Sequence, residues 1–304
     1  MKKWFVVVVF SLIAISFANC QADSFEEGSP DPLLIDDGQV TLTPFQPQNQ
    51  TPTSVPTATA EPTLTPTPTK QVCSETLGQV IESQIQPVGY NQPFSFTLYL
   101  PPCYQSNAPK NGYPLLTLLH GQNYTSQQWI DIGLADKMDQ LIRDKEIDPF
   151  IVVMPNETAD YAAGLNVVIL KELIPYLQEE YLICSGRACN AIGGISRGGG
   201  WALTAAFKNP DFFISLGLHS TPTSSGHLEI VRYGAAAAGP ENLPRIWVDF
   251  GRSDYWYTSE KDLIDTFDRS GVVYDYNLNE GGHDNVYWEA HLMDYLRWYA
   301  DGWK

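Results

Sequence analysis

From Phe94 onward the chain alternates short apolar segments with amphipathic helical patterns, and this alternation limits the folds open to it. The segments 115–119 (LLTLL) and 150–154 (FIVVM) are nearly continuous apolar runs, as in strands buried on both faces of a sheet. Between them, 134–143 has apolar residues at helical spacing. Strands that alternate with helices predict an α/β domain, a mostly parallel sheet with helices on both faces. The predicted strands are 94–100, 115–119, 150–154, 190–194, 213–218, 245–250 and 272–278, and the predicted helices are 134–143, 166–181, 199–208, 260–269 and 285–299.

Five glycines surround one serine in the segment 190–201 (NAIGGISRGGGW). A predicted strand precedes this serine and a predicted helix follows it, so Gly194-Ile195-Ser196-Arg197-Gly198 stands at a strand-to-helix turn. This is the context of the G-x-S-x-G nucleophile elbow, whose tight turn leaves no room for side chains two residues before and after the serine. The amides at the start of the following helix favour negative charge that develops beside the serine. We therefore predict that Ser196 is a nucleophile and not part of a flexible loop.

A serine hydroxyl needs a base, and in α/β-hydrolases the acid and then the histidine follow the serine along the chain. His120 precedes the serine, while His219 and His227 come before the strand that should supply the acid. His291 lies inside the last predicted helix. His283 follows the last predicted strand in the sequence GGHDN, where the glycines leave room for an exposed ring, so we predict that it is the base.

The acid should lie between the nucleophile and the base, after a strand. The segment RIWVDFGRSDY offers Asp249 within the predicted strand and Asp254 on the loop after it. Because a loop residue can reach the imidazole, we predict Asp254 as the acid and Asp249 as a buried structural carboxylate. Asp284 cannot easily orient the ring of His283, its direct neighbour.

An acyl-transfer oxyanion needs two backbone donors. The amide of Arg197, directly after the nucleophile, is one candidate. The segment 115–123 (LLTLLHGQN) supplies the other, for which we predict the Gln122 amide, with Gly121 as the alternative. We expect His120 to be a buried hydrogen-bonding residue that shapes this loop.

Seven motifs follow one another between residue 94 and the C-terminus: YLPPCY (99–104), YPLLTLLHG (113–121), FIVVMP (150–155), ELIPYL (172–177), AIGGISRGG (191–199), DFGRSD (249–254) and GGHD (281–284). In this order the chain resembles the esterase D family of α/β-hydrolases, which includes feruloyl esterases, enterochelin-type esterases, S-formylglutathione hydrolases and mycolyltransferases. The resemblance implies a triad of Ser196, Asp254 and His283 that cleaves carboxylic esters through an acyl-enzyme. Neither a metal nor a cofactor is expected. The chain departs from the family at Arg197, where Met or another apolar residue is usual, and this cation either alters the pocket or pairs with an acidic substrate group.

Aromatic residues cluster in the sequence near these site loops. We predict that some of them line a substrate pocket for an aromatic acyl group or a sugar ring, and the alternative is that each is a core or rim residue. The candidates are Tyr124, Trp129, Trp201, Trp256 and Trp288, with Tyr255 and Tyr287 beside them.

Three other functions use the same fold. Acyl transfer to a sugar or alcohol, as in the mycolyltransferases, uses the same triad and differs in acceptor access. Serine peptidases of this fold commonly carry a propeller or cap domain, for which this chain has no room. A non-catalytic binding module is expected to have lost a member of the triad, and none is missing here.

The first residues have the pattern of an export signal. Lys2 and Lys3 precede an apolar run over 4–18, which is shorter than the roughly 20 residues needed to span a bilayer. The run ends in SFANC, so residues 1–20 resemble a bacterial lipoprotein signal with Cys20 as the acylated residue. The alternative is ordinary signal cleavage nearby, with Cys20 removed or left free.

A linker is predicted for residues 21–72. Between Thr41 and Thr69, 10 threonines and 7 prolines make up 17 of 29 residues, and Glu61 is the only charged one. Such a segment cannot bury enough apolar area to offset its ordering entropy. It is interpreted either as a stalk that holds the domain 73–304 away from a surface or as a low-complexity tail.

Four cysteines remain for the predicted domain. An even number in an exported chain indicates disulfides, and the short loop CSGRAC favours Cys184–Cys189, which leaves Cys73–Cys103. No histidine stands at ligand spacing to either pair, so metal binding is the weaker alternative. A formal net charge of −17 argues against nucleic acid or an anionic membrane surface as a partner, so we expect membrane association only through a lipid on Cys20.

Overall fold

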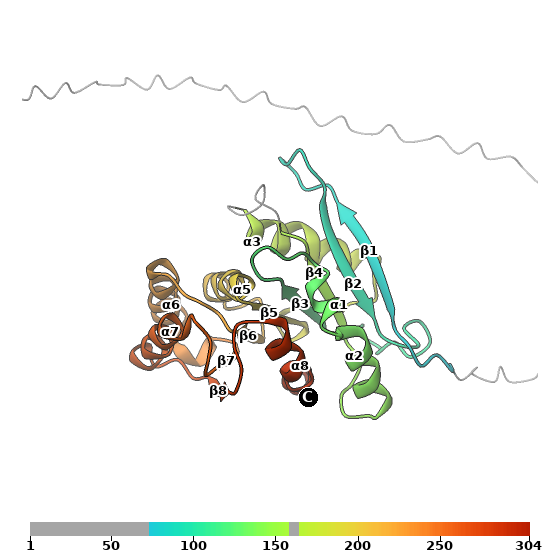
Figure 1. Cartoon of the computed structure of the whole chain (residues 1–304). Coiled ribbons are helices and arrows are strands. Elements are labelled where there is room, and N and C mark those ends of the chain that lie inside the picture. The colour runs from blue at the N-terminus through green and yellow to red at the C-terminus, as the bar shows by residue number, and fades with distance from the viewer. Residues whose placement is uncertain (1–72, 158–163) are drawn as a thin grey trace, which may run out of the picture. The chain divides into compact units, whose positions relative to one another are not determined.

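Eight strands form one sheet in the computed structural model, which describes residues 73–157 and 164–304 (Figure 1). The strand order is β1-β2-β4-β3-β5-β6-β7-β8. β2 runs antiparallel to both of its neighbours, and all other adjacent strands are parallel. The strands are β1 (Gln79–Ile85), β2 (Phe94–Leu100), β3 (Leu115–Leu119), β4 (Ile151–Pro155), β5 (Asn190–Ile195), β6 (Ser215–His219), β7 (Arg245–Gly251) and β8 (Asp275–Asn279).

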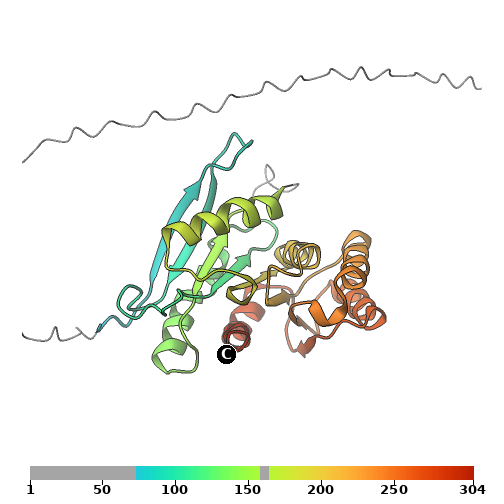
Figure 2. The same ribbon diagram turned by 180° about the vertical axis from the view of Figure 1, so that it is seen from behind.

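Helices cover both faces of the sheet. One face carries α1 (Gln128–Asp131), α2 (Leu134–Arg143) and α8 (Asn285–Asp301). The other carries α3 (Leu165–Val168), the π-helical turn η1 (Ile169–Leu173), α4 (Ile174–Glu180), α5 (Arg197–Lys208), α6 (Ser225–Ala238) and α7 (Tyr257–Ser270). Figure 1 shows α2 and α8 on one side and α3 and α5 on the other, and in Figure 2 the helix from α3 to α4 lies over β1 and β2. Two short 3-10 turns, η2 (Arg187–Cys189) and η3 (Pro240–Asn242), precede β5 and β7.

The central strands are apolar throughout because each of their faces packs against helices. In β3, Leu115 and Leu119 belong to the core under α3 to α7, whereas Leu116 and Leu118 belong to the core under α2 and α8. All four side chains are buried. Successive residues of a strand point to opposite faces, so a continuous apolar run fills both cores.

The predicted α/β fold is confirmed, and each predicted strand and helix overlaps an observed element of the same type. Among the described strands and α-helices, one strand and two helices were not predicted: β1, α1 and α6. β1 is an edge strand with no fully buried residue, and α1 has only four residues. The α6 segment ends in four alanines and buries only Val231 and Ala235 along its length. None of the three has the strong apolar periodicity on which sequence reasoning depends.

Both predicted disulfides, Cys73–Cys103 and Cys184–Cys189, are present. Within residues 73–157 and 164–304 no helix is long and apolar enough to cross a membrane. The predicted signal peptide at 1–20, the acylated Cys20 and the linker at 21–72 lie outside the described residues.

A buried carboxylate joins the last helix to the sheet. Asp249 of β7 is fully buried, and its Oδ1 accepts a hydrogen bond from Trp247 Nε1 and lies 2.8 Å from His219 Nδ1. Its Oδ2 accepts hydrogen bonds from the hydroxyls of Tyr287 and Tyr295 on α8, at 2.9 and 2.6 Å. Burial, followed by the charge of Asp249, raises the pKa of Tyr295 well above its usual range, so this hydroxyl stays a donor. Asp249 is therefore a structural carboxylate, as predicted.

Asp249→Ala is expected to destabilise the domain strongly, because it leaves several buried donors without an acceptor. We expect the free energy of unfolding to fall by about 3 to 5 kcal/mol, measured by urea unfolding. Asp265→Ala removes an aspartate of a surface ion pair with Lys261 and should leave the unfolding midpoint unchanged. Equal midpoints for the two variants would contradict the structural role of Asp249.

Candidate active site

Ser196 occupies the sharp turn between β5 and α5. Its backbone has φ 54° and ψ −120°, in the left-handed region that residues other than glycine rarely adopt. A Cβ atom on Gly194 would collide with the backbone of Gly198, and one on Gly198 would collide with the carbonyl oxygens of Leu119 and His120. The turn is therefore pressed against the end of β3, and only glycine fits at these two positions.

The three predicted catalytic side chains form one chain of hydrogen bonds. His283 Nδ1 lies 2.7 Å from Asp254 Oδ2, and His283 Nε2 lies 2.8 Å from Ser196 Oγ. Because a carboxylate can only accept, Nδ1 carries the proton, and Nε2 is left to accept from the serine hydroxyl. The second oxygen of Asp254 accepts from the Trp256 amide at 2.8 Å. Asp254 is 4% exposed and Ser196 8%, so the serine and the acid are both largely shielded from water.

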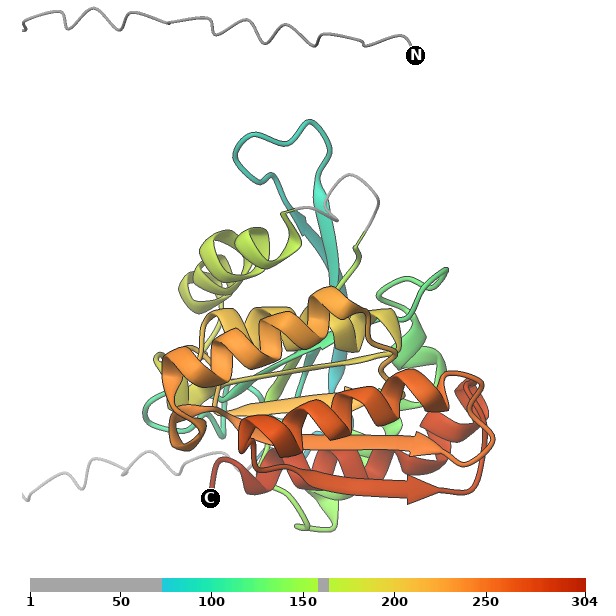
Figure 3. The same ribbon diagram turned by 90° about the vertical axis from the view of Figure 1, so that its left-hand side faces the viewer.

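The loops that carry the acid and the histidine are bonded to each other. Asp254 follows β7 and His283 follows β8, and the arrowheads of these parallel strands point to the same side in Figure 3. The Ser253 amide donates to the Gly281 carbonyl at 2.9 Å, and the Arg252 amide donates to the Asn279 carbonyl at 2.8 Å. Neighbouring parallel strands thus bring together two residues 29 positions apart in sequence.

Two amides are available beside the serine. The Gly121 amide donates to the Gln128 side chain at 2.7 Å and so is already occupied. Among the described residues, the amides of Gln122 and Arg197 have no hydrogen-bond acceptor. The Gln128 side chain also donates to Asn285 Oδ1 of α8 at 3.0 Å, which anchors the loop after β3.

A cavity of about 260 Å³ opens over the serine. Tyr124, Tyr255 and Trp256 at its rim are 43%, 73% and 46% exposed, whereas the Trp288 ring is buried in its wall. The Tyr255 ring lies 5.0 Å from the His283 ring. The remaining lining residues are Gly121, Gln122, Asn123, Ser196 and His283.

The sequence model of the family described as "Putative esterase" matches residues 89–299. The chain belongs to this esterase family. The prediction of an ester hydrolase with the α/β-hydrolase fold is thereby confirmed.

Named relatives point in the same direction. The "Endo-1,4-beta-xylanase/feruloyl esterase" of Xylanibacter ruminicola is 34% identical over 122 residues, which are 36% of this chain and 17% of that longer protein. Among solved structures, a ferulic acid esterase has a TM-score of 0.67 at 22% identity, covering 75% of this chain and 99% of that one. The S-formylglutathione hydrolase FrmB of Staphylococcus aureus has a TM-score of 0.62 at 20% identity, covering 75% and 98%. At these identities the solved structures show a shared fold.

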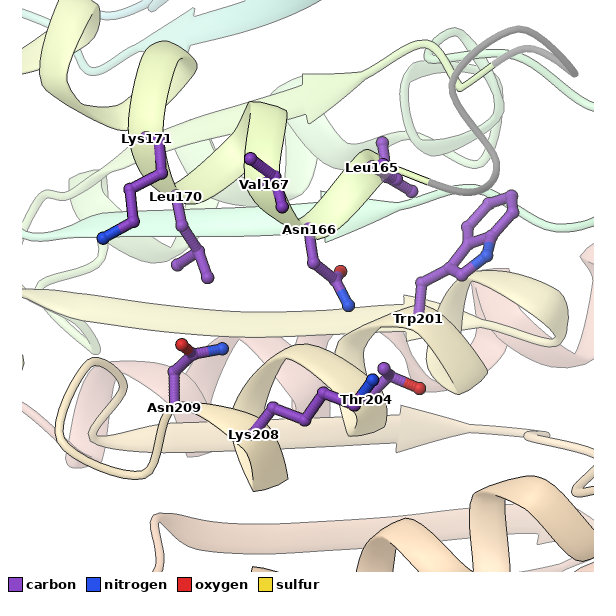
Figure 4. Close-up of a pocket in the computed structure, with 10 residues that line it drawn as sticks. Leu165, Asn166, Val167, Leu170, Lys171, Trp201, Thr204, Lys208 and Asn209 are labelled. Carbon is purple, nitrogen blue, oxygen red and sulfur yellow. The ribbon is translucent and has the colours of Figure 1, made fainter. Parts of the chain in front are cut away.

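Three of the predicted pocket aromatics, Trp129, Trp201 and Tyr287, do not line this cavity. Tyr287 is buried and its hydroxyl donates to Asp249. The Trp129 ring is fully buried and donates from Nε1 to the Leu119 carbonyl, so its prediction as a substrate contact is wrong. Trp201 of α5 lines a second cavity of about 350 Å³ between α3 and α5, together with Lys171 and Lys208 (Figure 4). The sequence placed both tryptophans near site loops but could not show which way their rings point.

The Arg197 side chain does not line the cavity over Ser196. Its Nη2 lies 3.0 Å from Glu157 Oε2, and its guanidinium lies 4.6 Å from the centre of the Trp201 ring. Burial raises the pKa of the Glu157 carboxyl, and the charge of Arg197 opposes this rise. The Glu157 amide donates to Nε2 of His120, which is buried beside it as predicted. The unusual cation of the elbow is thus paired within the protein.

Sequence reasoning missed Glu260, Gln128 and Glu157 at this site. Glu260 is fully buried beside Asp254, although it stands in the first turn of a helix, where an exposed glutamate is common. Gln128 and Glu157 lie in segments without a motif, and only the fold brings them to the serine. No spacing rule in the sequence marks any of the three.

Arg197→Met should lower stability more than activity, because the backbone amide at this position is retained while Glu157 loses its partner. The carboxyl of Glu157 then keeps its proton in the folded state to a higher pH. The Glu157 carboxyl of the variant therefore favours the folded state below its unfolded pKa of about 4.5, and this contribution to the free energy of unfolding is lost as the pH rises. We expect unfolding to cost about 1 to 2 kcal/mol less at pH 8, with a smaller difference at pH 5, and kcat/KM to stay within about threefold.

The double variant Arg197→Met with Glu157→Gln removes the titrating group and should show no such pH dependence. A loss of activity above about tenfold in Arg197→Met at unchanged stability would instead place the cation on the substrate.

Proposed function

We propose that the protein is an exported serine carboxylesterase that cleaves aromatic acyl esters, of the feruloyl type, from a carbohydrate or other alcohol. The observation that carries this proposal is the unbroken chain of hydrogen bonds from Ser196 through His283 to Asp254, open to a cavity at the Ser196 end. A complete triad of this geometry is what acyl transfer requires, and it argues against a non-catalytic binding module.

In the proposed reaction, Ser196 Oγ attacks the ester carbonyl while its proton moves to His283 Nε2. The oxyanion accepts hydrogen bonds from the free amides of Gln122 and Arg197. The imidazolium, balanced by Asp254, then protonates the departing alcohol as the acyl–oxygen bond breaks, which leaves an acyl-enzyme on Ser196. Water, deprotonated by His283, attacks this ester in the same way and releases the acid.

The aromatic rim favours a planar acyl group. Tyr124, Tyr255 and Trp256 line the cavity and are partly exposed, and a hydroxycinnamate ring can stack on aromatic side chains of this kind. A relative of this chain in Xylanibacter ruminicola is named an endo-1,4-beta-xylanase/feruloyl esterase. One structural neighbour is a feruloyl esterase module from Clostridium thermocellum in complex with sinapinate. Its TM-score is 0.62 at 18% identity, covering 76% of this chain and 91% of that one. An acetyl ester or a siderophore-like ester would use the same triad but would gain little from the rim.

Export is supported by the two disulfides, which persist in oxidising compartments. We infer that residues 1–20 act as the export signal, that Cys20 carries a lipid, and that the Thr/Pro-rich stretch within 21–72 acts as a stalk. The esterase would then work at the cell surface on substrate outside the cell.

Ser196→Ala should abolish hydrolysis of methyl ferulate and p-nitrophenyl acetate by the purified full chain, with kcat reduced by about 10⁴-fold or more. A fluorophosphonate should add one covalent label to the wild type and none to the variant, as measured by mass spectrometry. Wild-type activity equal to that of Ser196→Ala on every ester would rule out the proposed function. Product analysis with added alcohol acceptors would distinguish hydrolysis from acyl transfer of the mycolyltransferase type.

Trp256→Ala should raise KM for methyl ferulate by about tenfold, because it removes a stacking face but keeps the backbone amide that holds Asp254. The KM for p-nitrophenyl acetate should change less, because the acetyl group is small. Tyr233→Ala, which removes an exposed aromatic ring from α6, is the matched control and should leave both values unchanged. A similar rise in KM for both esters would show that the rim does not select the acyl group.

A further inference from the structure

One buried carboxyl group beside the triad has no place in the reaction described so far. Glu260 lies in the first turn of α7 and is fully buried. One of its oxygens, one of Asp254 and a ring nitrogen of His283 lie within 4.8 Å of one another. Among the described residues, no N–H or O–H group donates to either oxygen of Glu260, and no cation pairs with it. Burying an ionised carboxylate without a donor or a cation would carry a desolvation penalty of several kcal/mol.

The groups that face Glu260 are mostly acidic. The charges of Asp249, in β7, and of Asp254, on the loop after β7, act on Glu260. Asp249 is also hydrogen-bonded to His219 of β6. Tyr276 of β8 and Tyr287 of α8 also interact with it, and both have raised pKa values that keep them neutral. His283 is the one group nearby that becomes cationic in the reaction. Burial, then the charges of Asp254 and Asp249, and a hydrogen bond with Asp254 raise the pKa of Glu260 to about 9.

A neutral carboxyl group has one O–H donor, and the nearest charged acceptor is Asp254. That carboxylate already accepts from His283 and from the Trp256 amide, and each of its oxygens can accept a further bond. An O–H···O⁻ bond is among the stronger hydrogen bonds found in proteins. The absence of any other donor to Glu260 therefore has a simple chemical explanation: Glu260 is itself the donor.

We propose that Glu260 is a positioning residue of the triad, which stays protonated and donates a hydrogen bond to Asp254, so that this carboxylate keeps the orientation in which it holds His283. The role builds on the proposed function, since it acts through the triad. Three donors then surround the Asp254 carboxylate, from the imidazole, the Trp256 amide and Glu260. The pair of acids carries one negative charge between them, which balances the single positive charge of the imidazolium.

A residue that only fills space would behave differently. Methionine nearly matches the length of glutamate and would pack in the same position, but it has no donor. Glutamine has the shape of a protonated glutamate and keeps a donor that cannot ionise. Comparing Glu260→Gln with Glu260→Met therefore separates donation from packing.

The test measures kcat and KM of the full chain for p-nitrophenyl acetate between pH 6 and pH 10, with Ser196→Ala as background. Glu260→Gln should keep kcat within about threefold of the wild type, whereas Glu260→Met should lose about tenfold or more in kcat with little change in KM. The wild type should lose activity with a midpoint near pH 9, where Glu260 ionises, and Glu260→Gln should retain its activity there. Full kcat in Glu260→Met, or an unchanged alkaline loss in Glu260→Gln, would overturn the proposal.

A melting series tests the protonation state without relying on activity. In the folded protein the Glu260 carboxyl keeps its proton well above its unfolded pKa of about 4.5. Its contribution to the free energy of unfolding is therefore fully present below pH 4.5 and is lost as the pH rises toward 9. The melting temperature of Glu260→Gln should therefore match the wild type at pH 5 and exceed it by about 3 °C more for each further pH unit up to 9. Glu280→Gln, which removes an exposed carboxylate from the loop before His283, should show no such trend. A constant difference between Glu260→Gln and the wild type would contradict a protonated Glu260 even if the protein proved not to be an esterase.

Discussion

The site depends on a backbone contact between the end of β3 and the turn at Ser196. A Cβ atom on Gly198 would collide with the carbonyl oxygens of Leu119 and His120, and one on Gly194 would collide with the backbone of Gly198, so strand, turn and loop meet without intervening side chains. This contact holds Ser196 in a left-handed conformation that costs about 1 to 3 kcal/mol and persists only where the surroundings enforce it. The same contact brings the loop of Gln122 beside the start of α5. Ser196 and the two free amides are thus positioned by one feature of the backbone.

The other half of the site depends on the last helix. Asp249 binds two tyrosines of α8 from within the sheet, and Trp288 of the same helix donates to Ser220 Oγ at 3.0 Å just after β6. The Trp288 ring packs edge-on against His283 at 5.2 Å. The buried hydrogen bonds therefore fix α8 against the strand ends, and α8 in turn forms the wall against which the His283 imidazole packs. Asp249 thus holds α8 against the sheet, whereas Asp254, on the loop after the same strand, bonds to His283.

Most of the fold and the three residues of the proposed triad could be predicted from the sequence, because both leave local signals. Apolar runs mark buried strands, and a glycine two residues before and after Ser196 marks the elbow. Ring orientation and long-range contact leave no such signal. Trp129 and Trp288 both stand near site loops, yet the first is buried in the core away from the cavity and the second forms the cavity wall. The partner of Arg197 lies 40 residues earlier in the chain, so only the folded chain identifies it.

Asp249, Asp254 and Glu260 are three buried acids, and the charges of the two aspartates act on Glu260. The three differ in how each is accommodated. Asp249 has hydrogen-bond donors on both oxygens and does not contact the catalytic imidazole. Asp254 has the imidazole and one amide, so its charge faces His283. Glu260 has no donor among the described residues, and burial beside two other acids favours its neutral form. In the proposed reaction the His283 ring carries at most one positive charge, and one ionised carboxylate in contact with it balances that charge. A second ionised acid beside His283 would oppose the transfer of the proton from His283 to the leaving group.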